Sequence, residues 1–150
     1  WRTIKMAYVI TINNRLYKIA ANETDKNEHV SSYPPYVANE ISDSDFTKVK
    51  SGVSTVVVSA DGTISFEEDT SCVFENADEL NQYLTWVKSC MAPFLNQSVN
   101  SSKAIYSEIN TYKSLLDSFD TSSVSFPLNS SWEKYCEDNS IAYISPLQIP

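Results

Sequence analysis

The sequence predicts an α+β fold, with a small antiparallel sheet of two β-hairpins, a short helix between the hairpins, a helical half and an extended C-terminal tail. Three observations predict it. Two β-rich segments within residues 6–68 are each interrupted by a two-residue turn signal. Apolar residues recur at helical spacing after residue 76, and two prolines interrupt the apolar C-terminal segment. Strands followed by helices are typical of the α+β class.

The first hairpin is expected over residues 6–20, where Asn13-Asn14 separates two runs rich in β-forming residues. Asparagine tolerates positive φ, so a tight two-residue turn fits this position. Residues 21–40 are polar, and we expect a loop there. This loop includes a polyproline II stretch at Tyr33-Pro34-Pro35-Tyr36.

A short helix is predicted next, capped by Ser42 or Asp43 and followed by Gly52 at the position where helices favour glycine. The second hairpin is expected over residues 53–68, because Asp61-Gly62 lies between β-branched runs. Both glycines of the chain are therefore expected to serve local backbone geometry, and neither is left for a ligand-binding loop.

The second half is predicted to contain two long helices and one short helix. The first begins after Asn76 and has its apolar residues three and four positions apart, which predicts a stripe facing a core; they are Ala77, Leu80, Leu84, Val87, Met91 and Phe94. The second helix is expected over about residues 102–119, and the third from Ser130 to near Asn139. A single domain over residues 1–150 is predicted, with 6–70 and 74–150 as candidate subdomains.

The charge and the scarcity of two residue types exclude several function classes. A net charge of −8 disfavours binding to nucleic acid or to an anionic membrane. Two glycines cannot build a glycine-rich phosphate loop, and one histidine cannot form a metal cage of several histidines. His29 is expected to be solvated in the polar loop. We therefore expect no catalytic residue, no cofactor and no metal site.

The cysteines and the clustered acids are the remaining candidates for catalytic or metal-binding residues. Cys72, Cys90 and Cys136 are odd in number and lack zinc-finger spacing, so free thiols are expected. Acidic residues cluster at several places, and two of these clusters lie where helices are predicted to begin, which the helix dipole explains. Paired carboxylates also leave open a hydrolase of cell-wall glycans, in which one buried Glu would act as the acid.

Two apolar segments are candidate partner contacts. Tyr33, Pro34, Pro35 and Tyr36 present aromatic rings on a stiff backbone, which suits either a docking edge or a connecting loop. The C-terminal segment carries four apolar side chains, which either pack on their own domain or reach a neighbouring chain; they are Tyr143, Ile144, Leu147 and Ile149.

Residues 6–20, with their short hairpin, and residues 131–150, with their proline-bearing end, resemble small structural proteins of tailed bacteriophages, marine and cyanophage-like ones in particular. The resemblance implies a virion component and supplies no active-site residues. We therefore expect a non-catalytic assembly protein of a phage tail, baseplate, neck or capsid surface, made in the host cytoplasm and located in the virion. Its expected partners are other virion proteins or copies of itself. A transient assembly chaperone or adaptor for a tail or tail-fibre protein is the alternative.

Overall fold

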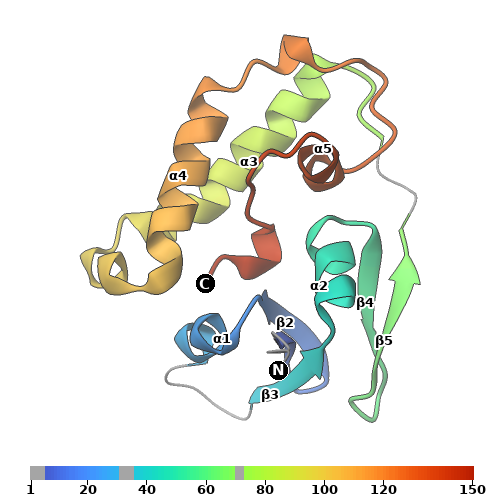
Figure 1. Ribbon diagram of the computed structural model, residues 1–150, viewed down its shortest axis with the longest axis vertical. Coiled ribbons are helices and arrows are strands. Elements are labelled where there is room, and N and C mark those ends of the chain that lie inside the picture. Colours follow the sequence, from blue (N-terminus) through green and yellow to red (C-terminus); the bar gives the residue numbers. More distant parts are fainter. Residues whose placement is uncertain (1–5, 31–35, 70–72) are drawn as a thin grey trace, which may run out of the picture. The chain divides into compact units, whose positions relative to one another are not determined.

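The computed structural model describes residues 6–30, 36–69 and 73–150 (Figure 1). The protein is α+β, with a small antiparallel sheet, and it divides into two compact units. Unit 1 comprises residues 1–69 together with Pro150, and unit 2 comprises residues 70–149. Unit 1 holds all the strands of the described residues, and unit 2 holds the long helices.

The predicted first hairpin is confirmed. Strands β1 (Ala7–Ile12) and β2 (Arg15–Ala20) pair antiparallel, and Asn13 and Asn14 between them have φ values of 52° and 59°. Positive φ at both central residues is the requirement of the tight turn that matches the twist of a hairpin. The register shifts between Ile10 and Thr11, which explains why β2 does not alternate strictly between apolar and polar residues.

The loop predicted over residues 21–40 is wrong in two places. Helix α1 (Glu23–His29) lies within it, and strand β3 (Tyr36–Ile41) occupies its end from residue 36 onward. Strand β3 pairs antiparallel with β1 in the order β2-β1-β3. The polar sequence of α1 has no apolar periodicity that would predict a helix. Asn22 caps this helix by accepting a hydrogen bond from the Asp25 N–H. As an edge strand with mostly exposed or half-buried residues, β3 has little of the apolar pattern that marks a strand.

The prediction that His29 is a solvated loop residue is also wrong. His29 lies in the last turn of α1 and is 7% exposed. Helix α1 contacts β1 and β2, so a helix without an apolar stripe still buries part of its surface. Tertiary packing, rather than local sequence pattern, decides the environment of this histidine.

The second half of unit 1 follows the predicted local signals. Ser42 caps α2 (Asp43–Lys50) through the Asp45 N–H, and Gly52 follows its end with a φ of 76°. Strands β4 (Ser54–Val58) and β5 (Ile64–Glu68) form the second hairpin, and Gly62 in its turn has a φ of 89°.

The two hairpins do not share one sheet, contrary to the prediction. The β4–β5 hairpin is a separate two-stranded sheet. It is connected to the first hairpin at the turns, where the Asn14 side-chain amide donates a hydrogen bond to the Ala60 carbonyl oxygen at 2.8 Å. The first sheet instead obtains its third strand from β3, whose residues were assigned to the loop.

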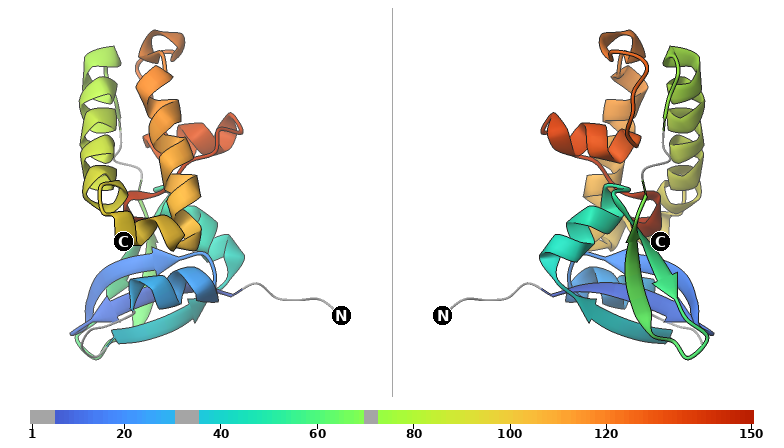
Figure 2. Two further views of the ribbon diagram at one scale, coloured as in Figure 1. Left: turned by 90° about the vertical axis from the view of Figure 1, so that its left-hand side faces the viewer. Right: turned by 90° about the vertical axis from the view of Figure 1, so that its right-hand side faces the viewer.

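Unit 2 is built from α3 (Ala77–Leu95), α4 (Ala104–Ser118) and α5 (Trp132–Asp138). Figure 2 shows α3 and α4 running side by side, with α5 lying across their direction. Asn76 caps α3 and Ser131 caps α5, each accepting a hydrogen bond from a main-chain N–H three residues later. Helix α4 begins later than predicted because residues 98–102 form a short 3-10 helix first.

The core of unit 2 is centred on Trp132, which is fully buried. Its ring packs edge-to-face against Phe119 at 4.8 Å between ring centres and stacks on Tyr135 at 5.7 Å. Its indole N–H donates a hydrogen bond to the Tyr112 hydroxyl at 2.8 Å. The predicted apolar stripe of α3 supplies one wall of this core; its buried members are Leu80, Leu84, Val87, Met91 and Phe94.

The C-terminal segment joins the same core. Ile144 and Ile149 are 7% and 2% exposed and belong to the buried cluster of unit 2. The segment is not extended throughout, because Pro146–Gln148 form a 3-10 turn. Ser145 caps this turn by accepting from the Leu147 N–H, and the Gln148 side chain accepts from the Ser145 N–H.

Candidate functional site

The first predicted contact segment is only partly described. Tyr33, Pro34 and Pro35 lie outside the described residues. Tyr36 opens β3, and its ring lies 6.1 Å from the ring of Tyr17 on β2. Tyr36 is therefore half-buried as part of the three-stranded sheet.

The second predicted contact segment is largely used within unit 2. Ile144 and Ile149 are 7% and 2% exposed, so most of each side chain packs in the core of unit 2. Leu147 is half-buried, and Tyr143 donates a hydrogen bond from its hydroxyl to a Glu137 carboxylate oxygen at 2.8 Å. Burial, together with this carboxylate, raises the pKa of Tyr143, so its hydroxyl stays protonated and remains a donor.

A surface that sequence reasoning missed lies on α3. Phe74, Tyr83 and Trp86 form an aromatic row, with distances of 5.6 Å and then 5.7 Å between successive ring centres. Trp86 at the end of the row is 51% exposed, and Val73 beside Phe74 is 43% exposed. The segment before α3 is held by Phe74, which exchanges two main-chain hydrogen bonds of 2.8 Å with Leu128.

The helical spacing of apolar residues does not indicate the aromatic row, because that spacing marks the stripe that faces the core. Tyr83 and Trp86 lie next to that stripe, three residues apart, and therefore share a neighbouring face of the helix. Aromatic residues placed off the core stripe of an amphipathic helix were the available signal. The half-exposed Trp86 is a candidate contact residue, because Trp and Tyr are enriched among the residues that dominate the binding energy of protein interfaces.

The buried Glu133 holds the central ring of the aromatic row, Tyr83, through a hydrogen bond. Glu133 on α5 is 5% exposed and accepts a hydrogen bond from the Tyr83 hydroxyl. Burial raises the pKa of Glu133 above the ordinary value for a glutamate, and the Tyr83 hydrogen bond opposes part of that rise. A raised pKa is a property of catalytic acids. Here the carboxyl group lies in the core between helices, where its evident effect is to orient Tyr83.

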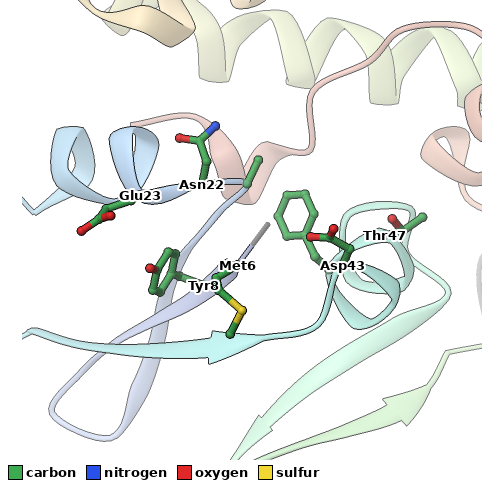
Figure 3. Close-up of a pocket in the computed structure, with 8 residues that line it drawn as sticks. Met6, Tyr8, Asn22, Glu23, Asp43 and Thr47 are labelled. Carbon is green, nitrogen blue, oxygen red and sulfur yellow. The ribbon is translucent and has the colours of Figure 1, made fainter. Parts of the chain in front are cut away.

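Unit 1 carries a hollow of about 540 Å³ between the first turns of α1 and α2 (Figure 3). Met6 and Tyr8 lie between its two sides, and Glu23 and Asp43 lie on opposite sides of it. Each of these acids is in the first turn of its helix, where the dipole favours a negative charge. The helix dipoles therefore account for the placement of both acids.

Unit 2 carries a smaller hollow of about 330 Å³, which we call the α4 hollow. It lies between α4 and residues 142–144. Tyr112, Leu115 and Ile144 contribute apolar surface, and Glu108 contributes a carboxylate. Thus Tyr143 and Ile144, which the sequence marked as contact residues, line this hollow instead of projecting from the unit.

The thiols and acids form no metal centre in the part of the chain that the structure describes. Cys90 is half-buried and Cys136 is buried, and both are free thiols, whereas Cys72 lies outside the described residues. Burial and the nearby Glu133 raise the pKa of Cys136, so this thiol is a poor nucleophile. Within residues 6–30, 36–69 and 73–150, no three His, Cys, Asp or Glu side chains are grouped to hold a metal ion.

No helix in these described ranges combines the length and the apolar character needed to span a bilayer. Comparison with known proteins found no matching protein-family model, no matching curated protein and no matching solved structure.

Proposed function

We propose that this protein is a structural or assembly component of a tailed-phage particle and acts through protein–protein contacts. The observation that supports a contact function best is the aromatic row, which ends in the half-exposed Trp86. The phage context rests on the resemblance of residues 6–20 and 131–150 to small virion proteins. The proposed location is the virion, and the proposed partners are other virion proteins or further copies of the chain.

The aromatic row suits a contact surface for a physical reason. Large aromatic side chains supply much contact area at a low cost in conformational entropy, because they have only two rotatable side-chain bonds. The row is also held in place before any partner arrives. Glu133 holds Tyr83, and Tyr83 packs against both Phe74 and Trp86. A surface ordered in advance loses less entropy on binding than a mobile one.

The test is incorporation into particles. Particles assembled with the wild-type chain, Trp86→Ala or Val99→Ala would be purified, and the copy number of the chain would be measured by quantitative mass spectrometry. Val99 is the matched control, since it is an exposed apolar residue of unit 2 outside the aromatic row and is 71% exposed. We expect the wild type and Val99→Ala in the particle at equal copy number, and Trp86→Ala reduced at least about tenfold.

Circular dichroism of each purified variant would show that the reduction is not a folding defect. Absence of the wild-type chain from mature particles would contradict the proposal. Its presence in infected cells but not in particles would instead favour a transient chaperone or adaptor. Equal incorporation of Trp86→Ala and wild type would remove the aromatic row from the proposal.

A further inference from the structure

We propose that the α4 hollow is a second docking site, which binds an extended peptide segment of a partner protein through one apolar anchor residue next to a Lys or Arg. This inference rests on the proposed function, because it names the chemistry of a partner. The anchor would enter the hollow between α4 and residues 142–144. The cationic residue would lie beside Glu108 and Glu137.

The size and surface of the hollow suit a side chain. Its volume of about 330 Å³ lies at the lower end of the range of about 300–1,000 Å³ found for ligand sites. Tyr112 and Ile144 contribute apolar surface and are 2% and 7% exposed, so both are held by the core of unit 2. A rigid apolar pocket of this size can bury one large side chain of a partner, and such buried anchors dominate the energy of interfaces.

The main chain beside the hollow favours an extended partner. Residues 141–145 lie outside any helix or strand. The main-chain N–H and C=O groups of Ala142 and Ile144 make no hydrogen bond to other described residues. Main-chain groups without a partner in the chain can pair with the main chain of an added extended segment. Ala142 is exposed, so its main-chain groups are open to a bound segment.

The charges select a cationic partner. Glu108 lines the hollow, and Glu137 accepts the hydrogen bond of the Tyr143 hydroxyl at its side. Neither acid forms an ion pair within the described residues. The nearby lysines are engaged elsewhere, since Lys113 pairs with Asp117 at 3.0 Å and Lys134 pairs with Asp138 at 2.5 Å. A Lys or Arg flanking the anchor would therefore meet uncompensated negative charge.

The experiment selects random seven-residue peptides, displayed on filamentous phage, against the purified full chain. Enriched peptides would be synthesised, and their dissociation constants would be measured by calorimetry. We expect enriched peptides to combine a large apolar residue with an adjacent Lys or Arg. Ala142→Trp should fill the hollow and weaken binding at least about tenfold, whereas Ala60→Trp, at an exposed site in unit 1, should not.

Two charge-reversal variants test the inferred preference for a Lys or Arg in the bound peptide. Glu108→Lys should weaken binding of the same peptides, while Glu67→Lys, an equal change at an exposed site in unit 1, should leave it unchanged. Enrichment of no peptide, enrichment of acidic peptides, or binding that Ala142→Trp leaves intact would each overturn the inference. Particle incorporation remains a separate measurement, so a failed peptide selection leaves the proposed function standing. Peptide binding at the hollow, without incorporation, would refute only the phage role.

Discussion

Unit 1 reverses its chain at backbone positions of positive φ, whereas unit 2 packs helices around a buried tryptophan. In unit 1 the turns depend on Asn13, Asn14 and Gly62, and the two hairpin turns are joined through the Asn14 amide. In unit 2 the helices converge on Trp132, which contacts aromatic rings on two sides. The stability of unit 1 should therefore be sensitive to backbone geometry, and that of unit 2 to side-chain volume.

The largest effect is expected from one substitution made at two tryptophans of unit 2. Trp132→Ala should lower the free energy of unfolding by about 3–5 kcal/mol, because it opens a cavity and leaves Tyr112 without its indole donor. Trp86→Ala should cost less than about 1 kcal/mol, because half of that side chain is already in water. Urea denaturation followed by circular dichroism measures both. Equal losses would show that unit 2 is not organised around Trp132.

A smaller effect is expected at the turn of the second hairpin. Gly62→Ala should cost about 1–2 kcal/mol, because φ is 89° and a Cβ atom there would lie 2.9 Å from the Asn14 Oδ1. Urea denaturation of the single variant checks this value. Repeating the substitution in the Asn14→Gly background separates the effect of the positive φ from the effect of the close contact. Asn14→Gly removes the contacting side chain, and glycine adopts the positive φ of residue 14 readily. If the cost is the same in both backgrounds, φ alone is responsible.

The subtlest effect is a pH dependence from the buried acid of unit 2. The pKa of Glu133 is raised in the folded state, so its protonated form is favoured by folding. The stability that Glu133 contributes is fully present below the pKa of a glutamate in the unfolded chain. It is lost as the pH rises through the raised pKa of the folded state. Each tenfold difference in proton affinity between the two states corresponds to about 1.4 kcal/mol.

Glu133→Gln should therefore remove this part of the pH dependence and gain stability relative to the wild type as the pH rises from 4 to 8. Urea denaturation over that range measures the difference between the two proteins. Tyr83→Phe is the complementary change, because it removes a hydrogen bond that lowers the pKa of Glu133. In that variant the loss of stability caused by ionisation of Glu133 should extend to higher pH. Parallel curves for wild type and Glu133→Gln would show that this carboxyl group does not titrate differently on folding.

Much of the fold could be predicted because its signals are local. The Asn13-Asn14 and Asp61-Gly62 turns, the Ser42 cap and the apolar stripe of α3 all involve residues within a turn or two of one another. Strand β3 and helix α1 could not be predicted in this way. Their sequences carry little apolar pattern, and β3 is a strand because β1 pairs with it.

The candidate sites were less predictable than the fold. The aromatic row requires residues that are distant in sequence, since Phe74 is held by Leu128 and Tyr83 is held by Glu133. The α4 hollow likewise requires the C-terminal segment to lie beside α4. The apolar composition of the C-terminal segment predicts that its side chains are buried, but the sequence does not indicate which surface they pack against.

The turns, the helix caps and the buried face of each long helix follow from the sequence alone, because they depend on hydrogen bonds and on periodicities of two or 3.6 residues between near neighbours. The pairing of β3 with β1, the separation of the two hairpins into two sheets, the burial of His29 and Glu133, and the exposure of Trp86 came from tertiary packing. Those outcomes depend on residues far apart in the chain that lie together only once the units have folded.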